Sequence, residues 1–260
     1  MLSTKHFMKN RFVGILLLIV MMSCASKKDI LYLQDADENI QTKIIYQTPT
    51  IQPNDILKIS VETLVPQAAA AYNRGNANGP MQNSIELLKL QGYLVSDQST
   101  INFPNIGKIE VANLTTEEVE IKIKRVLEDG GYLKNPTVTV RVVNAKVTVL
   151  GEVNSPGTFT FTEQNITILQ ALGYAGDLTI NGKRNDIIIT RDVNGSRVIS
   201  HIDLTSTDFM TSEFYFLKPN DNIIVNPNEP KVKQAGFIGN VGTALTVVSL
   251  ALTVTLLLTR

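Results

Sequence analysis

A turn followed by an alternating strand opens the folded part of the chain at residues 50–61, TIQPNDILKISV. The tripeptide at residues 53–55, Pro-Asn-Asp, consists of residue types that favour tight turns. After it, apolar side chains at every second position predict a strand with one buried face. The same tripeptide returns at residues 219–221, within YFLKPNDNIIV, again directly before an apolar strand. We therefore predict that two units of the chain use the same turn before a strand. We interpret Asp55 and Asp221 as turn residues, with ligand contact as the alternative.

The first unit, residues 48–142, is predicted to be a small sheet with one helix. Strand patterns occupy residues 93–111, which we expect to continue the sheet, and residues 137–142. Between them, Thr115 and Glu118 have the spacing of a capping box, in which each residue satisfies a backbone N–H of the other at a helix N-terminus. Apolar residues follow at helical spacing up to a glycine pair, which ends the helix.

The second unit, residues 146–228, repeats this composition of strands around a short helix that begins at Ile168. Within it, Asn194 and Gly195 form a strong signal for a two-residue hairpin. Residues 67–91 interrupt the first unit with a stretch rich in Ala, Gly and Asn, which predicts a mobile loop or a long hairpin tip. The two units together predict an α+β protein made of two small sheet-plus-helix modules.

The N-terminus has the form of an export signal over residues 1–23. Three basic residues precede the uncharged apolar run FVGILLLIVMM at residues 12–22, which is too short to span a bilayer comfortably. Cys24, the single cysteine of the chain, follows a small residue, so this site resembles a bacterial lipobox in which Cys24 receives a lipid. An ordinary signal peptide with a chance cysteine is the alternative. Ala25 and Ser26, not an aspartate, directly follow Cys24, which resembles outer-membrane sorting, and the polar residues 24–47 predict a tether.

The C-terminal segment predicts a transmembrane helix over residues 234–258. Residues 236–258 carry no charge and would extend over about 34 Å as a helix, enough to cross a bilayer. On a helical wheel, a stripe of small and hydroxyl-bearing residues falls within about 80°. The members of this stripe are Gly239, Gly242, Thr246, Ser249 and Thr253. The stripe predicts a pore lining or a helix-packing surface. A plain anchor, whose threonines bond to their own backbone, is the alternative.

Charge and chemistry-bearing residues exclude several classes of protein. The chain has 24 basic and 24 acidic residues, so the basic surplus of a nucleic-acid binder is missing. Once the signal is removed, His201 is the one histidine left, and it lies in a predicted strand without a G-x-S-x-G motif. Too few cysteines and histidines remain to build a zinc site. We therefore predict no enzyme activity, no catalytic residue, no metal and no cofactor.

Taken in order, several stretches resemble the Wza-like family of outer-membrane polysaccharide export proteins. In the first unit these are residues 51–57, 93–95, 101–107, 114–118 and 135–140. In the second unit they are residues 149–157, 171–176 and 217–221, together with Val225. The resemblance implies a polysaccharide export domain followed by one β-grasp SLBB domain. Large members of the family carry more than one β-grasp unit, whereas this chain has a single one.

The resemblance implies a function as well as a fold. It implies a homo-oligomeric, lipid-anchored pore in the outer membrane, with its body in the periplasm, through which a capsular or extracellular polysaccharide polymer leaves the cell. Its partners would be the polymer, membrane lipid and an inner-membrane polysaccharide co-polymerase or tyrosine kinase, and no nucleic acid. The alternative is a periplasm-facing lipoprotein that forms no pore and either binds saccharide or scaffolds an export complex.

Overall fold

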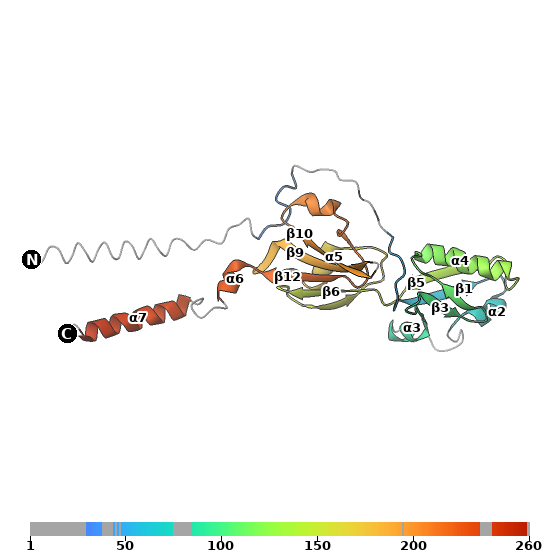
Figure 1. Cartoon of the computed structure of the whole chain (residues 1–260), viewed down its shortest axis with the longest axis horizontal. Helices are drawn as coiled ribbons and strands as arrows, with labels where there is room; N and C mark the ends of the chain where they lie inside the picture. The colour runs from blue at the N-terminus through green and yellow to red at the C-terminus, as the bar shows by residue number, and fades with distance from the viewer. Residues whose placement is uncertain are drawn as a thin grey trace, which may run out of the picture.

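The computed structural model describes residues 30–37, 44, 46, 48–74, 85–193, 195–234 and 241–258 of the 260-residue chain. Two domains of mixed α+β structure lie end to end along the longest axis of the molecule (Figure 1). Helix α7 (Val241–Leu258) extends from the side of the second domain that faces away from the first. The α+β class predicted from the sequence is confirmed.

The first domain is built on a three-stranded antiparallel sheet in the order β2-β1-β5. The strands are β1 (Ile56–Glu62), β2 (Tyr93–Leu94) and β5 (Thr137–Val142). Every second residue of β1 is buried, as its alternating pattern predicts. The buried face packs against α4 (Thr116–Asp129), whose Thr115 and Glu118 form the predicted capping box. This sheet and helix make up the core of the first domain.

Strands β3 (Thr100–Phe103) and β4 (Gly107–Glu110) form a separate two-stranded ribbon, so the expectation that they continue the sheet is wrong. Asn105 and Gly107 have φ angles of 61° and 93°, which turn the chain sharply enough for the two short strands to pair with each other. The ring of Phe103 stacks on Tyr93 at 5.5 Å between centroids and ties the ribbon to the core.

Both flanks of residues 67–91 are helical, which corrects the predicted loop. The helices are α2 (Pro66–Ala69), the 3₁₀ helix η2 (Ala70–Tyr72) and α3 (Ile85–Gln91), and residues 75–84 lie outside the described part of the chain. Proline in the first turn and the alanines that follow favour a helix. The Asn73 side chain then bonds to both backbone groups of Val61, at 2.8 Å each, so this flank is held against β1.

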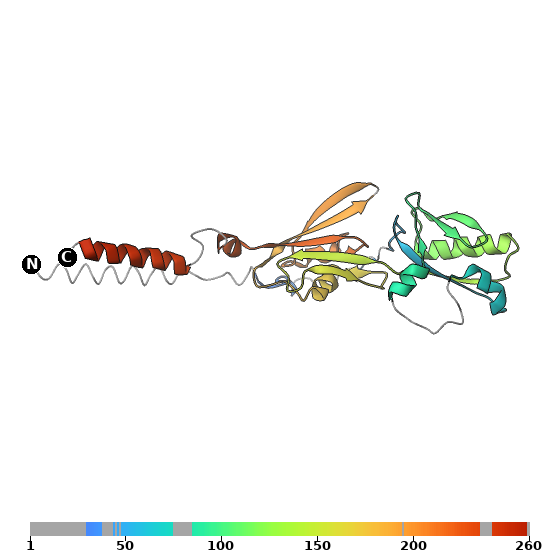
Figure 2. The same cartoon turned by 90° about the horizontal axis from the view of Figure 1, so that it is seen from below.

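The second domain is built on a five-stranded sheet in the order β10-β9-β12-β6-β7. Its strands are β6 (Lys146–Gly151), β7 (Gly157–Thr160), β9 (Gly182–Val193), β10 (Ser196–Ile202) and β12 (Asn222–Pro227). Strand β12 runs parallel to β6, and the remaining pairs are antiparallel. Val193 pairs with Ser196, which agrees with the predicted hairpin, and strands β9 and β10 stand away from the domain body (Figure 2).

Shorter elements complete the second domain. They are β8 (Ile166–Thr167), α5 (Ile168–Tyr174), η3 (Thr207–Thr211), β11 (Phe216–Leu217) and α6 (Glu229–Gln234). A second capping box, between Thr167 and Gln170, starts α5. Side chains from α5 pack with those of β6, β9 and β12 and form the hydrophobic core of the second domain.

Part of the predicted tether packs on the second domain. We call residues 30–37 the strap. The backbone N–H groups of Leu33 and Gln34 donate to the carbonyls of Leu204 and Thr205, at 3.1 and 2.7 Å. Leu33 also packs against the core of the second domain. This part of the tether therefore belongs to the folded domain, although its composition is that of a linker.

Helix α7 is the described part of the apolar segment near the C-terminus. Helix α7 has 18 residues, which gives a length of about 27 Å against about 30 Å for the hydrocarbon core of a bilayer. Within the described residues, no helix combines the length and apolar character needed to cross a membrane. The transmembrane helix predicted over residues 234–258 is therefore not supported. Gln234 ends α6, and residues 235–240 lie outside the described part of the chain.

Candidate functional site

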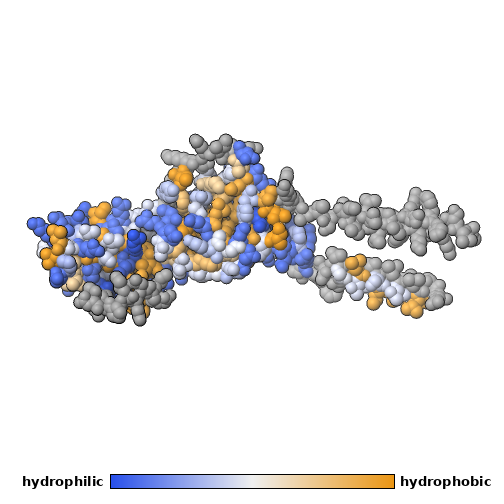
Figure 3. Space-filling model, turned by 180° about the vertical axis from the view of Figure 1, so that it is seen from behind, coloured by the Kyte–Doolittle hydropathy of each residue, from blue (hydrophilic) through white to orange (hydrophobic). Residues whose placement is uncertain are grey.

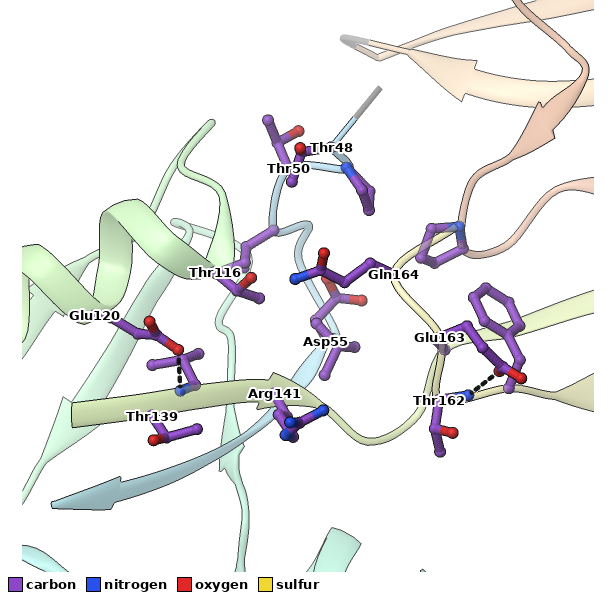
Figure 4. Close-up of a pocket in the computed structure, with 17 residues that line it drawn as sticks. Thr48, Thr50, Asp55, Thr116, Glu120, Thr139, Arg141, Thr162, Glu163 and Gln164 are labelled. Atoms are coloured by element: carbon purple, nitrogen blue, oxygen red, sulfur yellow. Dashed lines mark hydrogen bonds between the residues drawn. The ribbon is translucent and has the colours of Figure 1, made fainter. Parts of the chain in front are cut away.

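A cavity of about 360 Å³ lies where the two domains meet (Figure 4). The first domain contributes Asp55, side chains of α4 and the end of β5, and the approach to β1 contributes residues 48–51. The second domain contributes Pro219 and the loop at residues 161–164, which follows β7. These segments are far apart in the sequence, so the cavity exists only because the domains dock.

Asp55 is placed at this cavity by the turn that opens the first domain. Asn54 has a φ of 70°, a left-handed conformation that asparagine tolerates, and the Asp55 Oδ2 accepts a hydrogen bond of 2.9 Å from the Gln52 N–H. Asn144, in the linker between the domains, accepts from the Ile56 N–H at 2.8 Å and donates to the Asn54 carbonyl at 2.9 Å. The predicted turn geometry is confirmed, and the linker holds it in place.

Asp55 is also a buried charge. The residue is 3% exposed, and burial raises the pKa of its carboxyl to about 6, against the hydrogen bond from Gln52, which works to lower it. A carboxylate in such a position is costly to ionise without a cation beside it. Asp55 can therefore have a role at this cavity in addition to its role in the turn.

Asp221 occupies the same turn in the second domain but has a cation as partner. Asn220 also has a φ of 70°, and the Asp221 Oδ2 accepts from the Lys218 N–H at 2.8 Å. The Arg191 guanidinium donates to both carboxylate oxygens, from Nε at 3.0 Å to Oδ1 and from Nη2 at 2.7 Å to Oδ2. Burial raises the pKa of the Asp221 carboxyl, and the hydrogen bonds and charge of Arg191 oppose that effect. Both side chains of this ion pair are almost completely buried.

The walls of the cavity are more acidic than basic. Among the described residues that line it, three are acidic and one, Arg141, is basic. Two of the acidic side chains also bond to the backbone of the lining: Glu120 accepts from the Val140 N–H at 2.8 Å, and Glu163 accepts from the Thr162 N–H at 2.9 Å. Figure 4 shows these side chains arriving from both domains around Asp55. The cavity can therefore receive hydrogen-bond donors and positive charge.

Helix α7 carries the described part of the predicted stripe, whose residues are exposed. The Thr246 hydroxyl donates to the Gly242 carbonyl at 2.7 Å, Ser249 to the Thr246 carbonyl at 2.9 Å, and Thr253 to the Ser249 carbonyl at 2.7 Å. All three hydroxyl groups thus donate to carbonyls of their own helix, as the alternative of a plain anchor predicts. The hydroxyl oxygens can still accept hydrogen bonds from another molecule. In Figure 3 the described atoms of α7 are white and orange, without the blue of charged residues.

The remaining predicted residues do not gather at one site. Cys24 and Gly239 lie outside the described residues. His201 is a surface residue of β10, and its Nδ1 lies 2.6 Å from an oxygen of Asp186 on β9. Hydrogen bonds from His201 and Lys183 hold the pKa of the Asp186 carboxyl below its ordinary value. These contacts account for His201 as half of a cross-strand surface pair.

Sequence reasoning found Asp55 but missed the cavity. The repeated Pro-Asn-Asp tripeptide was the available signal, and it pointed to turns. Nothing in the local sequence shows that one aspartate faces an arginine while the other faces a cavity, because Arg191 lies 30 positions from Asp221. That difference depends on which strands become neighbours.

Comparison with known proteins gives two family matches. Residues 46–143 match the family described as polysaccharide biosynthesis/export protein, and residues 146–200 match the SLBB domain. One relative, named EPS I polysaccharide export outer membrane protein EpsA, from Ralstonia solanacearum, is 29% identical over 203 residues, which covers 75% of this chain and 51% of the relative. A protein of the same name from Ralstonia nicotianae is 38% identical over 106 residues, or 39% of this chain and 27% of that protein. The match thus covers about half the length of the first relative and about a quarter of the second.

Proposed function

Because the chain belongs to the Wza-like family of outer-membrane polysaccharide export proteins, we propose that it is a subunit of an oligomeric pore through which a polysaccharide polymer leaves the cell. The observation that carries this proposal is the order of the two family matches, with an export domain followed directly by an SLBB domain. The names of both relatives, which are polysaccharide export outer membrane proteins, support an outer-membrane location and a polysaccharide as cargo.

Anchoring in this proposal begins at Cys24, which carries a lipid in the outer membrane while the two domains lie in the periplasm. Cys24 is six residues before Ile30, where the described strap begins. Six extended residues span about 20 Å at most. Because the strap is hydrogen-bonded to the second domain, a lipid on Cys24 would hold that domain close to the membrane surface.

Assembly in this proposal depends on α7. Leu245, Leu250 and Leu257 are 63%, 66% and 74% exposed in the single chain. A helix with exposed leucines along its length is stable when other apolar surface covers it. Helices α7 of neighbouring subunits would provide that cover, with the stripe of Thr246, Ser249 and their neighbours between helices or along the lumen.

The proposed inner-membrane partner is a polysaccharide co-polymerase or tyrosine kinase. It would meet the first domain, because this domain lies at the end of the molecule away from α7 (Figure 1). With a single SLBB domain between α7 and the first domain, the periplasmic part is short, so such a partner would have to reach far into the periplasm.

The test is complementation of a strain that lacks this protein. Surface polysaccharide and polymer retained in the periplasm are measured side by side. We expect the deletion strain to retain polymer and to regain surface polysaccharide when the protein is restored. His201→Ala is the matched control and should restore export fully, because within the described part of the chain the His201 side chain is half of a surface pair with Asp186. Normal surface polysaccharide in the deletion strain would contradict an export function.

Electron micrographs of the detergent-purified protein test the pore separately. Rings with a central opening are expected. A monomeric particle from a protein that still complements export would favour a binding or scaffolding lipoprotein.

A further inference from the structure

Asp55 is a buried carboxylate with an open oxygen at the cavity between the domains. Its Oδ2 accepts from the Gln52 N–H, but no residue in the described part of the chain donates a hydrogen bond to its Oδ1. Among the described side chains, the polar atom that is both fully buried and without a partner is Nε of Arg184. The Oδ1 of Asp55 is therefore not sealed in the protein and reaches the surface of the cavity.

The second domain shows what this carboxylate lacks. Asp221 has the same turn, the same cap from the residue three positions earlier and the same degree of burial as Asp55. Arg191 fills the space in front of Asp221 with a two-pronged guanidinium. The equivalent space in front of Asp55 opens into the cavity. The fold thus contains the same carboxylate turn twice, once with an arginine in front of the carboxylate and once with a cavity there.

The rest of the lining fits a group that is positively charged and rich in N–H donors. Asp55, Glu120 and Glu163 outnumber Arg141 among the charged residues of the described lining. Thr50, Thr116 and Thr139 also line the cavity, and their hydroxyl oxygens can accept hydrogen bonds. Such acceptors can satisfy the N–H groups that a carboxylate alone would leave unpaired.

We propose that the cavity between the two domains binds a guanidinium or primary ammonium group, with the Asp55 carboxylate as its counter-ion. The volume of about 360 Å³ is within the range of small-ligand sites. Both domains and the linker contact the bound group, so its binding would fix the position of one domain against the other. The group belongs either to a basic side chain of a second copy of this chain or to a free solute. This proposal concerns the purified protein and is independent of the polymer that is exported.

The experiment titrates the detergent-solubilised full-length protein with methylguanidinium, followed by saturation transfer to its methyl protons. Tetramethylammonium, which has the same charge and no N–H donor, is the control probe at equal ionic strength. We expect methylguanidinium to bind at least about tenfold more tightly than the control, the value of one charge-assisted hydrogen bond. Asp55→Asn keeps an acceptor for the Gln52 N–H, removes the charge and should weaken binding by a similar factor.

Two further variants guard against an effect of misfolding. Gln164→Arg changes an exposed residue of the cavity wall and supplies a guanidinium from within the chain, so it should compete with the probe while leaving Asp55 in place. Glu117→Gln removes an exposed carboxylate of α4 that does not line the cavity, and it should bind as the unsubstituted protein does.

The oligomeric state, measured by mass photometry on the same samples, distinguishes the two sources. If a second copy supplies the cation, the unsubstituted protein binds no probe, and Asp55→Asn and Gln164→Arg both shift it to smaller species. If the cation is a free solute, the oligomeric state stays constant and probe binding depends on Asp55. The proposal is overturned if neither probe binding nor assembly depends on Asp55, or if Ca²⁺ binds in an Asp55-dependent way and methylguanidinium does not.

Discussion

Asp35 and Thr207 lie 172 positions apart in the sequence, yet the Asp35 carboxylate accepts a hydrogen bond of 2.7 Å from the Thr207 backbone N–H. The same carboxylate accepts from the Ser206 hydroxyl at 2.9 Å. Although desolvation works to raise it, these hydrogen bonds hold the pKa of Asp35 below its ordinary value. One side chain of the strap thus caps the short helix η3 and joins the strap to the second domain.

Asp35→Ala should therefore release the strap. We expect faster hydrogen exchange at the amides of Leu33 and Gln34, whose hydrogen bonds to the second domain depend on the docked strap. Because the folded-state pKa of Asp35 is lowered, its contribution is complete at neutral pH and is lost as the pH falls below the ordinary range of aspartate. Asp37→Ala, an exposed change two residues away, is the control, and equal exchange in both variants would contradict the role of Asp35.

Arg191→Met should destabilise the second domain by about 3–5 kcal/mol, because it leaves the Asp221 carboxylate buried without a cation. The measurement is the free energy of unfolding from urea titration at pH 7. Arg197→Met breaks an ion pair with Asp192 whose side chains are 67% and 66% exposed, and it should change the stability little. A similar loss in both variants would mean that burial does not set the cost.

Asp55→Asn should change how stability depends on pH. The pKa of Asp55 is about 6 in the folded protein, so between about pH 4 and pH 6 the folded state holds a proton that the unfolded chain releases. This carboxyl therefore destabilises the fold as the pH rises. Relative to the unsubstituted protein, the variant should gain on the order of 2–3 kcal/mol between pH 4 and pH 7. Urea unfolding at both pH values checks this, with the exposed Asp97→Asn as a control that should show no such gain.

Replacing Thr246, Ser249 and Thr253 together by leucine should block polymer export while the protein still reaches the outer membrane. The change keeps α7 apolar and helical but replaces the hydroxyl-bearing face with bulky aliphatic side chains. Surface polysaccharide in a strain that carries only this variant is the measurement. Val247 and Val254 are exposed on another face of the same helix, and their replacement together by leucine is the control. Normal export by the triple leucine variant would show that the stripe neither lines a pore nor packs subunits together.

Cys24→Ala should abolish lipid attachment. Mass spectrometry of the mature protein should show the loss of the acyl groups, and fractionation should show less protein in the membrane pellet. Ser26→Ala, two residues later, should be processed and lipidated normally. An unchanged mature mass in Cys24→Ala would refute the lipid anchor.

The helix and strand patterns of each domain could be predicted because their causes are local. The capping box of Thr115 and Glu118 involves residues three apart, and the same geometry starts α4 in the folded protein. The alternation in β1 records which face of one strand is buried, and it holds in the structure. The turn at Asn54 depends on a conformation that its own side chain tolerates. The loop predicted for residues 67–91 was wrong at both flanks, and the transmembrane helix predicted for residues 234–258 is not supported. Both predictions relied on composition alone, which does not show what a segment packs against.

By itself, the sequence determined the α+β class, the two repeated turns and the resemblance to polysaccharide export proteins, because each is encoded in residues close together in the chain. Only the tertiary structure decided that the strap docks on η3 and that a cavity lies between the domains. It alone decided that Asp221 meets Arg191 while Asp55 faces that cavity. The physical reason is that a buried carboxylate is neutralised by whatever group the fold brings within hydrogen-bond distance. That neighbour is set by the order of strands in a sheet and by the docking of two domains, neither of which is written in the turn itself.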